Sequence, residues 1–264
     1  MKFFTVAGPR ALIAVLTGAV TGAALAASVP VAAQDLSNPD SDFVDTTSNK
    51  AWHAVVEKTK RGYLIGNPKA DARLIMFTSY GCIGCHEFAF KGDPELDYAL
   101  LAPGILSIEI RLRFNHPADM PLTLLAGCGK PARFKVNHAM FIRDQKRWME
   151  SWSRASGYNR DIWSRDTMAA RNGLVSSLGF TDLMARRRGY SRMDLNTCLS
   201  DQREIARLRA NAASDNAEFG LPTDAEGYAK PHFVLDGERL EGVRDWDGLY
   251  PVLRDRFKPV SQSD

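Results

Sequence analysis

The chain has 264 residues, of which 45% are hydrophobic and 25% are charged, and its formal net charge is +3. This length suffices for about one to two domains with a substantial core, and the composition is that of an ordinary globular protein. The small net charge and the lack of an RNA- or DNA-reading motif argue against nucleic acid as a partner.

The first 33 residues are typical of a secretory signal peptide. Lys2 and Arg10 precede an apolar stretch, and small-residue cleavage patterns follow at 24–26 and 31–33. An uncleaved membrane anchor is the alternative, because residues 11–33 carry no charge. The stretch is rich in Ala, Gly and Thr rather than Leu and Ile, which favours cleavage. We expect a periplasmic protein, in a compartment that permits disulfides.

The mature chain is predicted to begin with a polar leader over residues 34–50, which we expect to be flexible. Residues 51–58 are then predicted to form a short helix. A short strand is predicted at 63–65. The nearly continuous apolar run 72–78 is typical of a central strand that is covered on both faces.

The sequence Cys82-Ile83-Gly84-Cys85 follows this strand directly and opens a predicted helix. Two thiols at this spacing can close a small disulfide. The unpaired N–H groups at a helix N-terminus lower the pKa of a thiol, so Cys82 is a candidate nucleophile. A zinc site made of all four cysteines is the alternative, although structural zinc sites usually contain two close pairs.

The helix after the cysteine pair is predicted to break at residues 92–94, Gly-Asp-Pro, and to resume over 95–101. A second strand is predicted at 105–114, with apolar and charged side chains alternating between its two faces. This strand–helix–strand order places the cysteine pair at the carboxyl end of the first strand, where sites form in open α/β sheets.

The pattern from 121 to 216 is helical throughout and predicts an insert of domain size. Strands return at 232–235 and 239–241 around an Asp236-Gly237 turn, and a helix is predicted over 246–257. The predicted division is therefore a first α/β part, a helical insert, a second α/β part and a tail: 51–120, 121–216, 217–257 and 258–264.

This order resembles the DsbA-like thiol–disulfide oxidoreductases of the thioredoxin superfamily. The resemblance runs from about Trp52 to Phe257 and is carried mainly by three segments. These are Gly66-Asn67-Pro68, Ser79-Tyr80-Gly81-Cys82-Ile83-Gly84-Cys85 and Lys230-Pro231-His232-Phe233-Val234-Leu235-Asp236-Gly237. It implies an α/β fold class, a thioredoxin fold with an inserted all-helical domain.

The resemblance implies a catalytic disulfide in which Cys82 is the exposed, attacked sulfur and Cys85 the buried, resolving one. Pro231 would match the family's cis-proline, and Lys230 would offer backbone groups to an extended substrate. No cofactor and no metal are implied. The implied partners are exported polypeptides with cysteines and a membrane quinone-linked electron acceptor. We also expect a monomer. The leader is too short for the N-terminal dimerisation module of the known isomerases, which argues against an isomerase.

The chain departs from the family's pattern at three positions. Ile83-Gly84 replaces a frequent Pro-His, which predicts a weaker oxidant, and Met76 stands where relatives carry a carboxylate. Lys230 replaces Val or Thr. We hypothesise that Gly84, His86 and Lys230 set the pKa of the Cys82 thiol, the two cations by attracting the thiolate. Alternatively, Lys230 points to solvent and His86 only covers surface.

Cys128 and Cys198 both lie in the helical insert, where some relatives hold a second disulfide. Exported proteins seldom leave cysteines unpaired, which favours a bond between them. Two buried free thiols are the alternative.

The insert is basic, with 17 Lys and Arg against 8 Asp and Glu from residue 130 to 209. Arg186-Arg187-Arg188 is its densest point. The cluster indicates an electropositive surface for acidic substrates or an anionic membrane, or solvated helix faces and a helix C-terminus before Gly189. Two further functions stay open. One is a disulfide reductase or isomerase, and the other a non-catalytic, metal- or partner-binding thioredoxin-like module.

Overall fold

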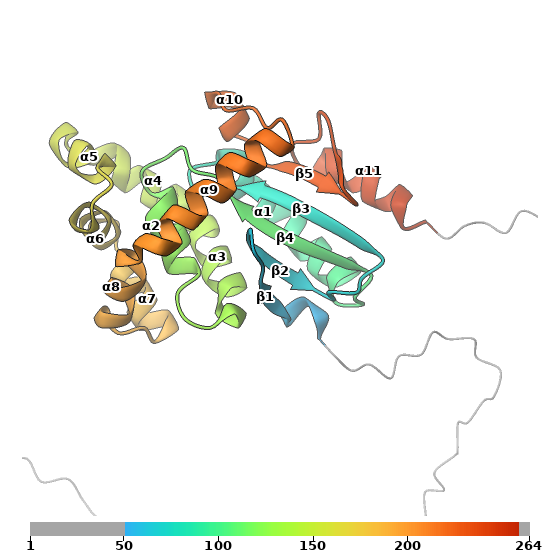
Figure 1. Ribbon diagram of the computed structural model, residues 1–264, viewed down its shortest axis with the longest axis horizontal. Helices are drawn as coiled ribbons and strands as arrows, with labels where there is room; N and C mark the ends of the chain where they lie inside the picture. The colour runs from blue at the N-terminus through green and yellow to red at the C-terminus, as the bar shows by residue number, and fades with distance from the viewer. Residues whose placement is uncertain (1–50, 259–264) are drawn as a thin grey trace, which may run out of the picture. The chain divides into compact units, whose positions relative to one another are not determined.

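The computed structural model describes residues 51–258, so the expected signal peptide, leader and residues 259–264 lie outside the described range. Its centre is a six-stranded sheet of order β1-β2-β4-β3-β5-β6 (Figure 1). Within it β3 and β4 are parallel and every other neighbouring pair is antiparallel. The strands are β1 Val56–Lys58, β2 Tyr63–Gly66, β3 Ala72–Thr78, β4 Leu106–Leu112, β5 His232–Leu235 and β6 Glu238–Arg239.

Two helices flank the sheet on one side, and a series of helices leaves it after β4 and returns along the other side (Figure 1). The helices are α1 Ile83–Leu96, α2 Asp119–Ala126, α3 Phe134–Arg143, α4 Gln145–Arg154, α5 Gly157–Ser164, α6 Met168–Ser177, α7 Phe180–Arg188, α8 Arg192–Ser200, α9 Gln202–Glu218, α10 Ala225–Tyr228 and α11 Trp246–Arg256. Short 3-10 turns span Trp52–Ala54 and Pro131–Arg133, and a π turn spans Asp97–Leu101. No helix among the described residues is long and apolar enough to cross a bilayer.

β3 has the predicted bounds and lies at the centre of the sheet. Met76 is in register with Ile110 of β4 and Phe233 of β5. The apolar run of β3 is buried on both faces because Leu74 and Met76 join the main core, whereas Ile75 and Phe77 join a second cluster. A strand that contacts protein on both faces needs this nearly continuous apolar sequence.

α1 is one continuous helix, so the predicted break at residues 92–94 is wrong. Pro94 lies inside it, and the helix widens into the π turn, where the Asp97 N–H donates to the carbonyls of both Asp93 and Pro94. Gly92 does not break the helix but allows a close contact between helices. A β-carbon there would lie 2.9 Å from the ring of Trp246, so its absence lets α11 approach α1 closely.

The predicted helix over 51–58 is also wrong beyond its first turn. Residues 56–58 form β1, whose Val56 pairs with Ile65 of β2. A short segment with two consecutive valines gains more from extending a sheet than from a second helical turn.

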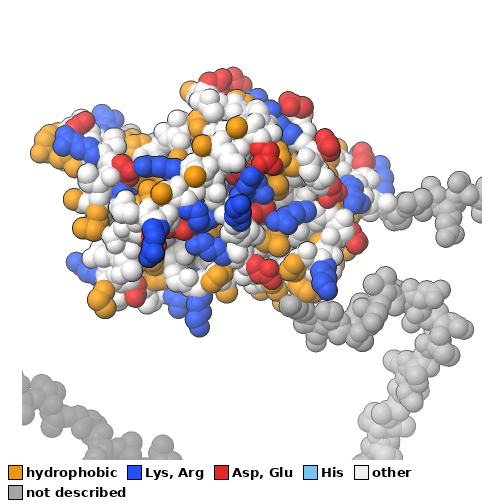
Figure 2. Space-filling model, viewed as in Figure 1, with side chains coloured by type: hydrophobic (Ala, Val, Ile, Leu, Met, Phe, Trp, Pro, Cys, Tyr) orange, Lys and Arg blue, Asp and Glu red, His pale blue; other side chains and the backbone are white. Residues whose placement is uncertain are grey.

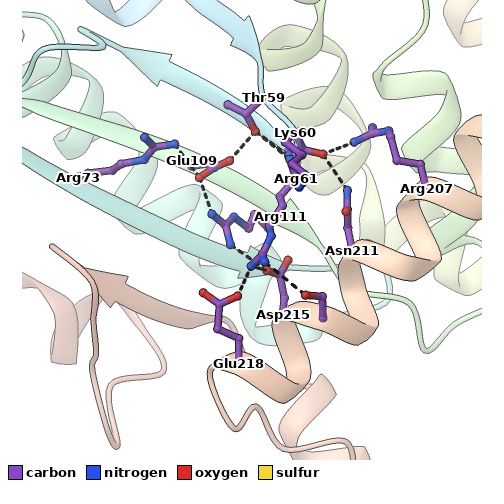
Figure 3. A network of polar contacts seen from close by, with 12 residues as sticks. Thr59, Lys60, Arg61, Arg73, Glu109, Arg111, Arg207, Asn211, Asp215 and Glu218 are labelled. Carbon is purple, nitrogen blue, oxygen red and sulfur yellow. Dashed lines mark hydrogen bonds and ion pairs between the residues drawn. The ribbon is translucent and has the colours of Figure 1, made fainter.

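The alternation predicted for β4 is present, but its charged face is not solvated. Helix α9 covers that face, and Glu109 is only 1% exposed (Figure 3). Glu109 accepts hydrogen bonds from Thr59, Arg73 and Arg111, the last at 2.9 Å. Arg111 also donates to Asp215 of α9 at 2.8 Å. We call Glu109, Arg111 and Asp215, with Arg61 and Arg73, the α9–β4 network.

Arg61 extends the α9–β4 network to the surface by donating to Asp215 at 2.9 Å and to Glu218. Lys and Arg side chains are interspersed with Asp and Glu on this face of the molecule (Figure 2). Both faces of the sheet are therefore covered, one by α1 and α11 and the other by α9.

The helical series from α2 to α8 forms the insert that the sequence predicts. Its core residues include Leu122, Phe141, Trp148, Phe180 and Leu199, all of them at most 1% exposed. A disulfide joins Cys128, just beyond α2, to Cys198 of α8, with 5.7 Å between the Cα atoms. This bond links residues 70 positions apart and ties the outer helices to α2.

Candidate active site

Cys82 immediately precedes α1, shortly after β3 ends, and Cys85 lies in the first turn of α1. A disulfide joins them, with 5.2 Å between the Cα atoms. Cys82 is the N-cap residue of α1, and its Sγ accepts the N–H of Cys85 at 3.0 Å. A sulfur at this position receives a backbone donor and the positive end of the helix dipole. Both favour the thiolate form after reduction.

Cys82 is not the exposed sulfur that the resemblance implies. Cys82 is only 1% exposed, and Cys85 is 4% exposed. Other segments of the chain approach Gly81 and Gly84 closely. A β-carbon at Gly81 would lie 2.6 Å from His116, and one at Gly84 would lie 2.6 Å from Lys230. The exposed residue of the motif is Ile83, at 59%.

The segment before Pro231 packs directly on the cysteine pair. The N–H of Gly84 donates to the carbonyl of Ala229 at 2.9 Å, and the side-chain stem of Lys230 covers Gly84. The expected cis bond before Pro231 is wrong, because no peptide bond among the described residues is cis. The trans form of an X-Pro bond is favoured by about 0.5–1 kcal/mol. Here Ala229 and Lys230 contact Gly84, between the two cysteines.

His86 has neither of the two expected roles: its side chain is not at the surface, and it makes no side-chain hydrogen bond to Cys82. It is 6% exposed, and its Nδ1–H donates to the carbonyl of Ile142 at 2.8 Å. Its contact with Cys82 runs through the backbone, from the His86 N–H to the Cys82 carbonyl at 3.3 Å. The imidazole therefore joins α1 to the end of α3.

Asp119 is a buried carboxylate beside the site that the sequence reasoning missed. It is 1% exposed and accepts the backbone N–H groups of Gly81, Asn115 and His116 at 2.7–2.8 Å. Burial raises the pKa of Asp119 to about 6, against the lowering effect of these hydrogen bonds. It fixes the turn that leads into Cys82. The only signal in the sequence is an acid in the first turn of a helix after a proline.

Gln145, the first residue of α4, also holds the active-site turn. Its Nε2 donates to the carbonyls of Tyr80 at 2.6 Å and Cys82 at 2.9 Å. Beneath it the Tyr80 hydroxyl donates to Nδ1 of His138 at 3.0 Å, and burial lowers the pKa of His138 to about 4, so the imidazole is a neutral acceptor. The helical insert thus contributes directly to the geometry of the cysteine pair.

The described residues contain no group of three or more His, Cys, Asp or Glu side chains that could hold a metal ion. All four cysteine sulfurs are in disulfides. The polar groups next to the Cys82–Cys85 disulfide include the side-chain amide of Gln145, backbone N–H donors and the Asp119 carboxylate.

A family model and several solved structures match this chain. Residues 58–254 match the family model described as thioredoxin. A crystal structure of protein-disulfide isomerase from Novosphingobium aromaticivorans is 32% identical with a TM-score of 0.67, over 74% of this chain and 97% of that one. Alpha-DsbA1 from Wolbachia pipientis is 14% identical with a TM-score of 0.57, over 78% and 95%. BdbD from Bacillus subtilis is 12% identical with a TM-score of 0.51, over 80% and 100%. None of the curated proteins compared matches the chain.

Proposed function

This chain belongs to the thioredoxin family, within its DsbA-like thiol–disulfide oxidoreductases, and we propose that it introduces disulfides into exported proteins through Cys82 and Cys85. The observation that carries the proposal is the disulfide across the first turn of α1, with a backbone N–H aimed at Cys82 Sγ. A bond placed there joins two sulfurs of which one is stabilised as a thiolate when the bond opens.

The reaction is an exchange in two steps. A substrate thiolate attacks Cys82 Sγ, the Cys82–Cys85 bond breaks, and Cys85 leaves as a thiolate that takes up a proton. A second substrate thiolate then attacks the substrate sulfur of the mixed disulfide, and Cys82 leaves as a thiolate. The substrate loses two electrons and two protons. The cysteine pair gains both electrons, Cys85 gains one proton, and the other proton goes to solvent while Cys82 remains a thiolate.

Each turnover leaves Cys82 and Cys85 reduced, so the cycle needs a separate electron acceptor. By analogy with the family, we propose a membrane quinone-linked partner, a periplasmic location and a monomeric chain. No cofactor enters the exchange itself, because both electrons stay on sulfur throughout.

Serine replacement of Cys82 tests the proposal. Cys82→Ser should abolish the oxidation of a reduced, cysteine-containing test protein, and Cys128→Ser/Cys198→Ser should retain it because that bond lies in the insert. Undiminished turnover in Cys82→Ser would remove the proposal. Bound metal in the purified chain with no thiol turnover would favour the binding-module alternative instead.

An isomerase or reductase is the second candidate, since the relative with 32% identity is named a protein-disulfide isomerase. The same two sulfurs would then pass electrons to the substrate instead of accepting them. Equilibrating the pair with glutathione separates the candidates. A potential near about −120 mV marks a disulfide donor, and one near about −270 mV marks a reductant. Because the motif lacks the family's histidine, we expect a value below the strong-oxidant end.

A further inference from the structure

A groove lies between α3 and α7, and its walls are basic. Its volume is about 850 Å³. Arg186, Arg187 and Arg188 from the last turn of α7 line one wall, and Arg143 and Arg147 line the other. A helix C-terminus explains why cations are favoured at the end of α7. It does not explain why two arginines from the end of α3 and the start of α4 meet them across the same hollow.

Several of these guanidinium groups are not neutralised. Arg147 pairs with Asp144, and Arg188 donates to Asn137 at 2.9 Å. Arg186 and Arg187 are exposed and have no carboxylate partner within residues 51–258. The lining holds five arginines against the two carboxylates Asp144 and Asp182. The groove is therefore complementary to an acidic ligand.

Part of the groove lining is apolar. Val136, Met140 and Leu183 form this part, and Val136 is 51% exposed. A free anion uses only the arginines, and a flat array of lipid headgroups cannot reach into a hollow. A polypeptide segment that alternates acidic and apolar side chains can use both surfaces at once. The groove chemistry thus favours a peptide over a membrane.

The groove shares a chain segment with a residue that holds the active-site turn. Arg143, Asp144 and Arg147 line it, and Gln145, which stands between them in the chain, donates to the carbonyl of Cys82 at 2.9 Å. The groove lining and the support of the Cys82 turn are therefore formed by neighbouring residues of one segment, 143–147.

We propose that this groove binds an acidic, partly apolar segment of the polypeptide whose cysteines exchange with Cys82. The inference rests on the proposed function, because it names the class of substrate that the same site favours. Binding in the groove raises the local concentration of substrate thiol at Cys82 and adds electrostatic steering to the encounter.

The test compares two synthetic peptides with one cysteine pair each. One carries four Glu and two Leu beside the cysteines, and the other carries Gln in place of each Glu. The oxidised full chain should oxidise the Glu peptide about fivefold or more faster in kcat/KM. This advantage should shrink as salt is raised from about 20 to about 500 mM, because the screening length falls several-fold over that range.

Arg186→Gln/Arg187→Gln should lose most of this preference. The matched control is Arg160→Gln/Arg203→Gln, which removes two other exposed arginines without a carboxylate partner in the described range. It should keep the preference. Neither pair of residues contacts the sulfurs, so reduction of all three proteins by glutathione should proceed at one rate and report intact folding and chemistry.

Three results overturn the proposal. Equal rates for the Glu and Gln peptides on the unaltered chain remove it while leaving the exchange activity in place. Equal loss of preference in both double variants makes it an effect of overall charge. Binding to phosphatidylserine vesicles that Arg186→Gln/Arg187→Gln abolishes, with the peptide preference unchanged, assigns the groove to a membrane. Failure with glutathione and both peptides would instead refute the proposed function.

Discussion

The α9–β4 network offers the sharpest test of how this fold is held together. We expect Glu109→Gln to destabilise the protein, because Glu109 is 1% exposed and its carboxylate accepts from two guanidinium groups at 2.8 and 2.9 Å. Glutamine has nearly the same volume as glutamate, but Arg111 then faces a neutral amide in place of a carboxylate. Removing one partner of a buried ion pair costs about 3–5 kcal/mol. With a urea m-value of about 3 kcal/mol/M, the midpoint should fall by about 1–1.7 M.

Glu57→Gln is the matched control, because Glu57 is exposed on the edge strand β1. The same substitution there should change the free energy of unfolding by less than about 0.5 kcal/mol. Urea unfolding followed by tryptophan fluorescence measures both. Equal effects of the two substitutions would refute the claim that the network stabilises the packing of α9 on β4.

The difference between Glu109→Gln and the unaltered protein should also depend on pH in a defined direction. Hydrogen bonds and charge from Arg111, with Thr59 and Arg73, outweigh burial and hold the pKa of Glu109 below its ordinary 4.5. A lowered carboxyl pKa contributes stability above the unfolded-state value, and that contribution is lost as pH falls through the folded-state value. The difference should therefore be full at pH 7 and shrink below pH 4.5. A difference that grows on acidification would contradict this.

Three further predictions concern the site and the insert. Burial raises the pKa of Asp119 to about 6, so the stability that this carboxyl contributes is full below the unfolded-state pKa of 3.8 and is lost as pH rises to about 6. Asp119→Asn should remove this pH dependence from the free energy of unfolding measured at pH 4 to 7. A pH dependence that persists in the variant would assign it to another group. Cys128→Ser/Cys198→Ser should lower the free energy of unfolding by about 4 kcal/mol in the chain-entropy model for a loop of this length, while exchange at Cys82 continues; a loss under about 1 kcal/mol would show that the bond constrains little. Tyr80→Phe removes the donor to buried His138 and should cost about 1–3 kcal/mol, measured by thermal unfolding against Tyr158→Phe, whose ring is 74% exposed.

The parts of the fold that local sequence determines were predictable. β3 has an apolar run because both its faces are buried, and the cysteine spacing marks the start of α1 directly. The edge strand β1 was not predictable, since Val56 is extended only by pairing with Ile65. The alternation in β4 indicates two faces correctly, but nothing local says that α9 covers the charged one.

The candidate site divides in the same way. Cys82 and Cys85 are evident from a four-residue motif, and the family resemblance assigned Lys230 and Pro231 to the site. Asp119 and Gln145 were missed because their roles depend on where the insert folds back. Their side chains bond to backbone atoms of residues 80–82, which no side-chain pattern reveals.

The amide of Gln145 gives the insert a role beyond lining a surface. A chain trimmed to the sheet with α1 and α11 would lose the Gln145 amide. The carbonyl of Tyr80 would then lack this donor, and the carbonyl of Cys82 would keep only the His86 N–H. The conformation of the turn that carries the first sulfur therefore depends on helices outside the sheet portion of the fold.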